Sequence, residues 1–367
     1  MDAAHGRPMS RRSYMGGSSI GEECPREAYM KWRWIYPRLQ DAKLFRVFDL
    51  GNSIEDDVAD FLRTFKQYTL KTKDGPDQIG GTYFGGHLGW HIDGLLDTQF
   101  SRHLWECKSA NSRRFNALAK TGILSAIYGA DTDLGYSLWS PTYGAQVQFY
   151  MGALKESGID CDSALVTVYN KNTSDLYIEE VTPDPDAFEE LQEQARWLLS
   201  LPAPPDAAFS SGSYQVRNYM SRDQRGIYLG EYTPSDPNCR NCRHSKPRLD
   251  DPEMRGQWGC TKFKKLLSHR DQEAGCFSHQ WMPDLINATL IDEDNAIYEK
   301  DDTRFRNAPA DEVGKGELMS SEIAFLSRNE WNFDATNVLA EIRQETNGTF
   351  QTEINKDDSD REEDPVA

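Results

Sequence analysis

Three ionisable residues stand within segments that are otherwise largely apolar. Asp93 lies in the run GWHIDGLL, and Glu106 and Lys108 lie in LWECKS a few residues later. Residues two apart on a strand share a face, so Glu106 and Lys108 are expected on one side and Cys107 on the other. Two carboxylates on neighbouring strands form an oxygen site for Mg²⁺ or Mn²⁺, and a nearby lysine can orient or deprotonate an attacking water. This spacing predicts a metal-dependent hydrolytic site.

The elements that must position these residues follow from hydropathy patterning. Residues 86–96 and 102–109 are predicted as strands, with 97–101 as the hairpin turn that places Asp93 beside Glu106. Helices are predicted over residues 21–36, 53–69, 143–157 and 184–201, and a second hairpin joins LVTVYNK to DLYIEEV. The expected fold is α/β, with a mixed central β-sheet flanked by helices. The competing interpretation is a solvated hairpin with ordinary surface charges, because a D…ExK pattern alone is weak.

Several ordered motifs together resemble the RecB-like nucleases of the PD-(D/E)XK superfamily. They are HIDG at 91–94, WECKS at 105–109, QVQFY at 146–150 and CPREAYMKW at 24–32. The opening YMGGSSIGEECPR is similar to that of phage-encoded members, and the family includes CRISPR-associated and lambda-type exonucleases. The resemblance covers residues 14–180 and implies a restriction-endonuclease-like core.

The resemblance also implies roles for individual residues. Asp93 and Glu106 would bind the metal, together with Glu55 of LGNSIEDDV and the backbone carbonyl of Cys107. Lys108 would position or activate the nucleophilic water. Glu55 stands where many relatives have His, and Asp56 or Asp57 is the alternative ligand if the register slips. Gln146 and Tyr150, one helical turn apart, would contact DNA, whereas an isolated QxxxY pair is more often a helix-packing pair.

Four cysteines form a second pattern with metal-binding spacing. Cys239, Cys242, Cys260 and Cys276 are arranged as C-x2-C-x17-C-x15-C. A CxxC turn places two thiolates on one metal, and two later cysteines complete a tetrahedral set, so a structural Zn²⁺ site is predicted. His244 and His279 are alternatives for one cysteine. The competing interpretation is a group of reduced, buried cysteines.

The resemblance leaves the identity of this metal open. Iron–sulfur relatives of RecB use one cysteine before the nuclease core and three after it, and Cys24 matches the early position. A [4Fe–4S] cluster held by Cys24 and three of the later cysteines is therefore the alternative to zinc.

Charge and composition bound the function classes. The chain has 367 residues and a net charge of −18, but residues 217–270 carry twelve Lys or Arg against six Asp or Glu, interleaved with Trp258 and Phe263. This local excess favours phosphate contacts with base stacking. The sequence shows neither an apolar run of membrane-spanning length nor a signal-peptide core, which predicts a cytoplasmic protein, in the host cytoplasm if phage-encoded.

The predicted organisation has five parts. They are a flexible lead at 1–17, a nuclease core at 18–201, a Cys-rich metal-binding module at 206–290, a weakly assigned region at 291–350 and an acidic disordered tail at 351–367.

The predicted function is that of a Mg²⁺-dependent deoxyribonuclease, an exonuclease in phage recombination, replication or repair by analogy with the family. The expected partner is DNA, without a membrane, and a homo-oligomer or a recombination or replication protein is a further expectation. The alternatives are an inactive DNA-binding module and a phage interaction or DNA-mimic protein acting through its acidic surface.

Overall fold

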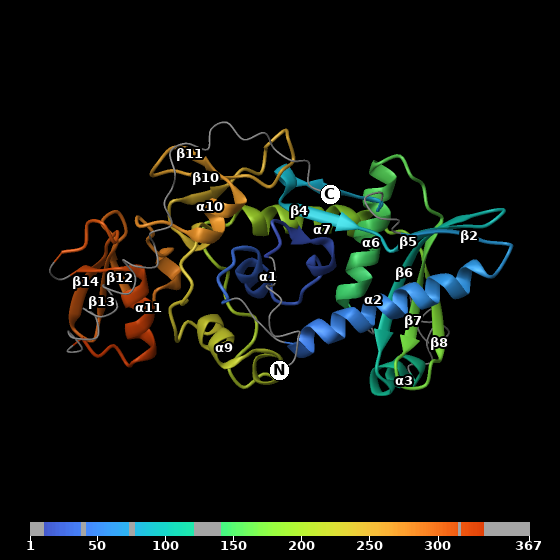
Figure 1. The fold of residues 1–367 in the computed structure, drawn as a ribbon, viewed down its shortest axis with the longest axis horizontal. Helices are drawn as coiled ribbons and strands as arrows, with labels where there is room; N and C mark the ends of the chain where they lie inside the picture. The colour runs from blue at the N-terminus through green and yellow to red at the C-terminus, as the bar shows by residue number, and fades with distance from the viewer. Residues whose placement is uncertain (1–10, 38–41, 73–77, 121–140, 315–316, 334–367) are drawn as a thin grey trace. The chain divides into compact units, whose positions relative to one another are not determined.

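The structure is a computed structural model that describes residues 11–37, 42–72, 78–120, 141–314 and 317–333 (Figure 1). The predicted acidic tail at 351–367 and the first ten residues of the predicted lead lie outside the described residues. The chain divides into two compact units. Unit 1 comprises Met1–Glu23, Arg38–Ser200 and Leu249–Gly256, and unit 2 comprises Cys24–Pro37, Leu201–Arg248 and Gln257–Ala367.

A five-stranded mixed sheet forms the centre of unit 1, in the order β2-β5-β6-β7-β8. Its strands are β2 (Thr69–Thr72), β5 (Gly94–Asp97), β6 (Arg102–Ala110), β7 (Ser163–Asn170) and β8 (Leu176–Val181). The β6–β7 pair is parallel and the other pairs are antiparallel. A parallel pair requires a long crossover, and the segment between β6 and β7 contains α3 (Ser112–Lys120) and α6 (Pro141–Glu156). The predicted mixed sheet is confirmed.

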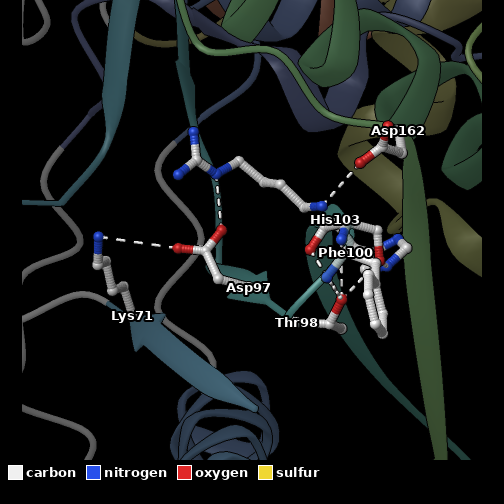
Figure 2. Close-up of polar contacts among 8 residues, drawn as sticks. Lys71, Asp97, Thr98, Phe100, His103 and Asp162 are labelled. Atoms are coloured by element: carbon white, nitrogen blue, oxygen red, sulfur yellow. Dashed lines mark hydrogen bonds and ion pairs between the residues drawn. The ribbon is translucent and has the colours of Figure 1, made fainter. Parts of the chain in front are cut away.

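The hairpin between β5 and β6 is closed by its own side chains. Thr98 Oγ1 accepts hydrogen bonds from the backbone N–H groups of Phe100, at 3.1 Å, and Ser101, at 2.9 Å. At the base of the turn, Figure 2 shows Asp97 facing Lys71 of the neighbouring strand β2, and Arg102 Nε lies 2.7 Å from Asp97 Oδ1. The turn predicted at 97–101 is confirmed, and it sets the register that pairs Gly94 with Trp105.

Helix α2 (Ala42–Arg63) packs on one face of this sheet. Its buried residues Ile54, Val58, Ala59 and Leu62 recur at helical spacing and contact Leu70, Leu96, Trp105 and Cys107. Because side chains alternate along a strand, Trp105 and Cys107 face α2 while Glu106 and Lys108 face the opposite side. This cluster therefore determines which face of β6 carries the ionisable residues.

The strand predicted at 86–96 is wrong, because the chain forms two strands that belong to different sheets. Strand β4 (Leu88–His91) joins a three-stranded sheet with β1 (Met15–Gly16) and β3 (Gly80–Tyr83), in the order β1-β4-β3. The chain then leaves this sheet at Ile92 and Asp93 and enters β5 of the five-stranded sheet. Apolar alternation continues through both strands, so hydropathy alone does not reveal the change of sheet.

Two further features complete unit 1. Helix α7 (Pro185–Ser200) packs against α6, and the short 3₁₀ helices η2 (Gly17–Ser19) and η4 (Phe84–Gly86) flank the three-stranded sheet. The returning segment Leu249–Gly256 lies close to the η4 backbone, where Gly256 N donates to Gly85 O at 2.7 Å. Gly86 has φ +87°, and a Cβ there would lie 2.1 Å from Met254 O, so a side chain at this position would displace the returning segment.

Unit 2 contains two small sheets and several short helices. One sheet has the order β11-β10-β9, from β9 (Ser245–Pro247), β10 (Trp258–Cys260) and β11 (Lys265–Leu267). The other has the order β12-β13-β14-β15, from β12 (Thr289–Asp292), β13 (Ile297–Lys300), β14 (Thr303–Asn307) and β15 (Glu317–Leu318). The helices are α1 (Pro25–Trp32), α8 (Tyr214–Tyr219), α9 (Arg222–Tyr228), α10 (His269–Ala274) and α11 (Ser320–Arg328), with 3₁₀ turns η5 (Cys239–Asn241) and η6 (Pro283–Leu285).

These units differ from the predicted organisation at three places. Leu249–Gly256, inside the predicted cysteine module at 206–290, belongs to unit 1. The segment Cys24–Pro37, with α1, belongs to unit 2 rather than to the unit that holds the Asp93 and Glu106 strands. The described part of the weakly assigned region at 291–350 contributes a regular sheet and α11 to the same unit as the cysteines. None of the described helices combines the length and apolar character that crossing a membrane would require.

Candidate active site

Asp93 and Glu106 lie next to one another where β5 and β6 meet. Asp93 directly precedes β5, and the last pair of the ladder joins Gly94 to Trp105. Beyond this pair, the Asp93 side chain replaces a backbone carbonyl as the hydrogen-bond acceptor for β6: Cys107 N donates to Asp93 Oδ2 at 2.9 Å. The predicted proximity of the two carboxylates is therefore present in the structure, although the Asp93 backbone is outside the strand.

Glu106 is the most buried ionisable side chain of this group. Its side chain has no solvent exposure, and its Oε1 accepts hydrogen bonds from Lys108 Nζ and, at 2.8 Å, from Gln146 Nε2 of α6. The other oxygen, Oε2, is buried without a hydrogen-bond partner among the described residues, as is Oε1 of Gln146. Buried polar atoms in native proteins are nearly always satisfied, so these two unsatisfied oxygens, on side chains that are hydrogen-bonded to each other, are candidates for contact with a further ligand.

Burial and, to a smaller extent, the nearby Asp93 carboxylate together raise the pKa of Glu106 to about 8, against the opposite effect of Lys108. A cation between the carboxylates would favour the ionised form of both, because an opposite charge at short range offsets desolvation and like-charge repulsion.

Glu55 of α2 contributes to the same electrostatic environment. It is partly buried, and its charge raises the pKa of both Glu106 and Cys107. Asp56 and Asp57, the alternatives in the sequence, are exposed on the same helix. The structure thus brings Glu55 toward the carboxylate pair.

Cys107 has its thiol on the other side of β6. The side chain is buried in the cluster beneath α2, and burial is the largest cause that raises its pKa. The backbone N–H of Cys107 holds Asp93, as described above. Ligation through its carbonyl oxygen stays a prediction.

Gln146 and Tyr150 of α6 are both buried rather than displayed on the surface. Gln146 is 4% exposed and holds Glu106, while Tyr150 is 4% exposed and has its ring centroid 6.3 Å from that of Trp90. Gln146 thus positions a carboxylate, and Tyr150 packs in the adjoining interior. Their predicted contact with DNA stays a prediction.

Tyr143 was not singled out from the sequence. It lies on α6 one turn before Gln146, and Lys108 Nζ is 5.0 Å from the centroid of its ring. A cation over an aromatic face is attracted by the ring quadrupole, so Tyr143 helps to hold Lys108 in place. Its spacing of i, i+3 from Gln146 is the signal that could have revealed it.

The donor set consists of carboxylate oxygens with one lysine beside them. Among the described residues, no three His, Cys, Asp or Glu side chains already form a closed set of metal ligands. One oxygen of Glu106, Oε1, is taken by the ion pair with Lys108. The remaining donors are carboxylate oxygens: Glu106 Oε2, the partly buried Asp93 and the partly buried Glu55. Mg²⁺ and Mn²⁺ prefer such ligands, so the residues fit a hard divalent cation.

The four predicted zinc ligands occupy one place in unit 2. Cys239, Cys242, Cys260 and Cys276 all line a small cavity, together with His244. Cys24, the candidate for an iron–sulfur site, is absent from that lining, and its Sγ lies 3.1 Å from Tyr228 Oη.

Comparisons with known proteins give a structural likeness only. No family model and no curated protein matches the chain. Two solved structures of an alkaline exonuclease from Laribacter hongkongensis align with it, one without ligand named and one in complex with dAMP. They give TM-scores of 0.33 and 0.34 and identities of 13% and 15%, each covering 52% of this chain and 87% of the other. At these values the alignments do not establish membership of a family.

Proposed function

We propose that the protein is a metal-dependent nuclease that hydrolyses phosphodiester bonds in DNA. One observation carries this proposal: Asp93 and Glu106 meet at the end of a strand pair, and Lys108 lies on the same face as Glu106. This group combines two oxygen donors with an ammonium, which is a recognised way to bind a divalent cation and steady a nucleophile beside it. The motifs that carry these residues also resemble those of RecB-like nucleases, in which they occur in the same order along the chain.

The residues divide the chemical work in the proposed mechanism. Asp93, Glu106 and the Cys107 carbonyl would hold Mg²⁺ or Mn²⁺, with Glu55 as a further ligand. The bound ion would supply Lewis acidity toward a phosphate oxygen and a water. Lys108 would exchange its bond to Glu106 for one to the attacking water: as the ammonium it would orient that water, and only as the neutral amine would it take a proton from it.

The supporting residues keep this group ordered without taking part in the reaction. Gln146 holds Glu106 by a 2.8 Å hydrogen bond, and Tyr143 faces the Lys108 ammonium. The backbone N–H of Cys107 fixes Asp93. Such preorganisation lowers the cost of reaching the reactive geometry.

The finer assignment is that of a deoxyribonuclease that degrades DNA from ends, in phage recombination, replication or repair. It follows from the motif resemblance, with the phosphate-binding potential of basic residues in 217–270 as a second support. DNA is the proposed partner.

The test compares Asp93→Asn with Asp97→Asn, a matched change at the other end of β5. Full-length proteins are incubated with end-labelled linear DNA and circular DNA in Mg²⁺, Mn²⁺ or EDTA. We expect metal-dependent cleavage by wild type, a loss of about 100-fold or more in Asp93→Asn, and near-wild-type cleavage in Asp97→Asn.

The outcomes separate the alternatives. Loss of linear DNA with circles spared supports an exonuclease, and cut circles support an endonuclease. Normal cleavage by Asp93→Asn overturns the site assignment. DNA binding without cleavage in any metal supports an inactive DNA-binding module, and neither activity supports an interaction protein.

A further inference from the structure

Four cysteines from separate segments of unit 2 line one small, partly open space. The space, called here the cysteine cavity, has a volume of about 20 Å³ and is lined by Cys239, Cys242, Cys260 and Cys276. The first two bracket η5, the third ends β10, and the fourth follows α10. Local sequence spacing brings only the first pair together, and the fold of unit 2 supplies the other two.

Backbone amides point at the sulfur atoms of three of these cysteines. Phe263 N lies 3.5 Å from Cys260 Sγ, three residues along the chain. Burial raises the pKa of Cys242 and Cys276, and backbone hydrogen bonds from His244 and Ser278, each two residues after its cysteine, act in the opposite direction. A neutral thiol is a weak acceptor, whereas a thiolate is stabilised by such donors, so tight turns with N–H groups facing sulfur suit cysteines that carry negative charge.

We propose that these four cysteines bind one zinc ion as a structural site. Zinc takes four ligands in a tetrahedron, commonly four thiolates, and a site with all positions filled by protein has no place for a substrate. This proposal is independent of the nuclease proposal, because it concerns other residues in the other unit.

The ligand set favours a single ion over a cluster held by Cys24. The four cysteines that line the cavity already supply the four ligands that one zinc ion needs. Cys24 is bonded to Tyr228 instead of lining the cavity. The arrangement with Cys24 as the fourth cluster ligand therefore has no support in unit 2.

The nearby histidines are engaged elsewhere. His279 uses both ring nitrogens, at 2.9 Å from Ser320 Oγ and 2.9 Å from Asn241 Oδ1. His244 lines the cavity, but its Nε2 lies 2.8 Å from Gln280 Oε1. We therefore assign the four zinc ligands to the four cysteine sulfurs rather than to a histidine nitrogen.

The sulfur atoms would have to approach to about 2.3 Å from the ion. Cys239 and Cys242 are buried in the turn at η5, while Cys260 and Cys276 are partly exposed. The four sulfurs do not already form a closed ligand set in the structure, so Cys260 and Cys276 would have to close on an ion held first by the CxxC pair. The ion would then cross-link η5, the β11-β10-β9 sheet and the segment after α10, and its binding energy would add to the stability of unit 2.

The test begins with metal content of the full-length protein, purified anaerobically. We expect one zinc per chain with neither iron nor acid-labile sulfide. Three variants are compared with it: Cys260→Ser removes a ligand, Cys260→His replaces it with another zinc ligand, and Cys161→Ser is the control in unit 1. The Kd for zinc should rise by more than about 100-fold in Cys260→Ser, beyond the loss expected for an outer-shell partner. It should stay near wild type in Cys161→Ser and be largely restored in Cys260→His.

A second measurement needs no variant to fold. Wild-type protein stripped with chelator is titrated with Co²⁺ alone, and we expect stoichiometric, intense absorption from tetrahedral thiolate coordination that zinc then abolishes. Weak octahedral absorption would overturn the proposal, as would unchanged zinc content in Cys260→Ser. Iron and sulfide that disappear in Cys24→Ser would replace zinc with the cluster.

Discussion

Glu106 in unit 1 and Arg240 in unit 2 are ionisable side chains without solvent exposure, and their surroundings are opposite in character. Arg240 donates from Nε to Gln272 Oε1 at 2.8 Å and from Nη1 to Trp32 O at 3.1 Å, and its guanidinium carbon lies 3.7 Å from the Trp34 ring centroid. Glu106 instead has one oxygen without a hydrogen-bond partner in the described part of the chain, and another carboxylate, Asp93, lies close by.

This difference distinguishes a buried charge that stabilises the fold from a buried charge that is kept for binding a ligand. The bonds from Arg240 to Gln272 and Trp32 satisfy buried acceptors that folding removes from water, so the arginine joins α1 to η5 within unit 2. Glu106 is held in an environment that disfavours its ionised form, which costs stability unless a ligand binds. Unsatisfied burial is therefore the stronger indication of a site, and the following variants test that contrast.

The largest effect is expected from Lys108→Ala. Removing the ammonium beside Glu106 should lower DNA cleavage by about 10²–10⁴-fold, the range for a lost acid–base group. Lys71→Ala, at an exposed lysine of the same sheet, is the control and should leave the rate unchanged. Single-turnover cleavage of end-labelled DNA gives the comparison, and equal rates for both variants would remove Lys108 from the mechanism.

Arg240→Ala should lower the free energy of unfolding of unit 2 by about 3–5 kcal/mol, because it leaves several buried acceptors unpaired and opens a void beside Trp34. Arg243→Ala is the matched control: Arg243 is partly exposed and donates to Glu293 O. That control should cost about 1 kcal/mol or less. Denaturant unfolding followed by tryptophan fluorescence measures both, and similar losses would mean that Arg240 is not specially stabilising.

Glu106→Gln should change the free energy of unfolding in the opposite direction from Arg240→Ala. Replacing a buried carboxylate by a neutral amide removes the repulsion from Asp93 and the desolvation of a charge, so stability in EDTA should rise by about 1–2 kcal/mol. Cleavage should be lost in the same variant. A destabilised Glu106→Gln protein would show that the bond from Lys108 outweighs desolvation, and Glu106 would then resemble Arg240.

The smallest effect is expected at a partly exposed ion pair in unit 2, between Arg306 and Glu317. A hydrogen bond from Arg306 and another from Gly314 N lower the pKa of Glu317. The resulting stabilisation is present above the unfolded pKa of about 4.3 and is lost as pH falls through the folded value. Glu317→Gln should remove this contribution to the pH dependence of the free energy of unfolding. Near neutral pH, the free energy of unfolding should change by less than about 1 kcal/mol, as for other surface ion pairs. An unaltered acid profile would contradict the assignment.

Local patterns predicted much of unit 1 but little of unit 2. Strand β6, its hairpin, the antiparallel β7–β8 pair and α6 were predicted because each has a clear period or turn signal. The shared face of Glu106 and Lys108 follows from strand alternation alone. The break at Ile92 and Asp93 was missed because both halves are apolar, and the orphan oxygen of Glu106 depends on packing against α6, which no short pattern encodes.

The grouping of α1 with unit 2 was also missed, for a related reason. The helix itself is predicted by a serine cap before it and Pro37 after it, but its partners lie more than 200 residues away, as in the hydrogen bond from Arg240 to Trp32. Contacts at that separation have no periodic signature. The small sheet at 289–318 has strands too short to stand out from the flanking turns.

The path of the chain between the units has a consequence for how the protein is made. Unit 2 takes its first helix from Cys24–Pro37 and the rest from residues beyond 200, and unit 1 takes back Leu249–Gly256. At about 5–20 residues per second, a ribosome that has made Trp32 reaches its partner Arg240, 208 residues later, only after about 10–40 seconds. The apolar face of α1 is exposed for that interval, which makes the nascent chain a client for chaperones, and neither unit can be excised by a single cut.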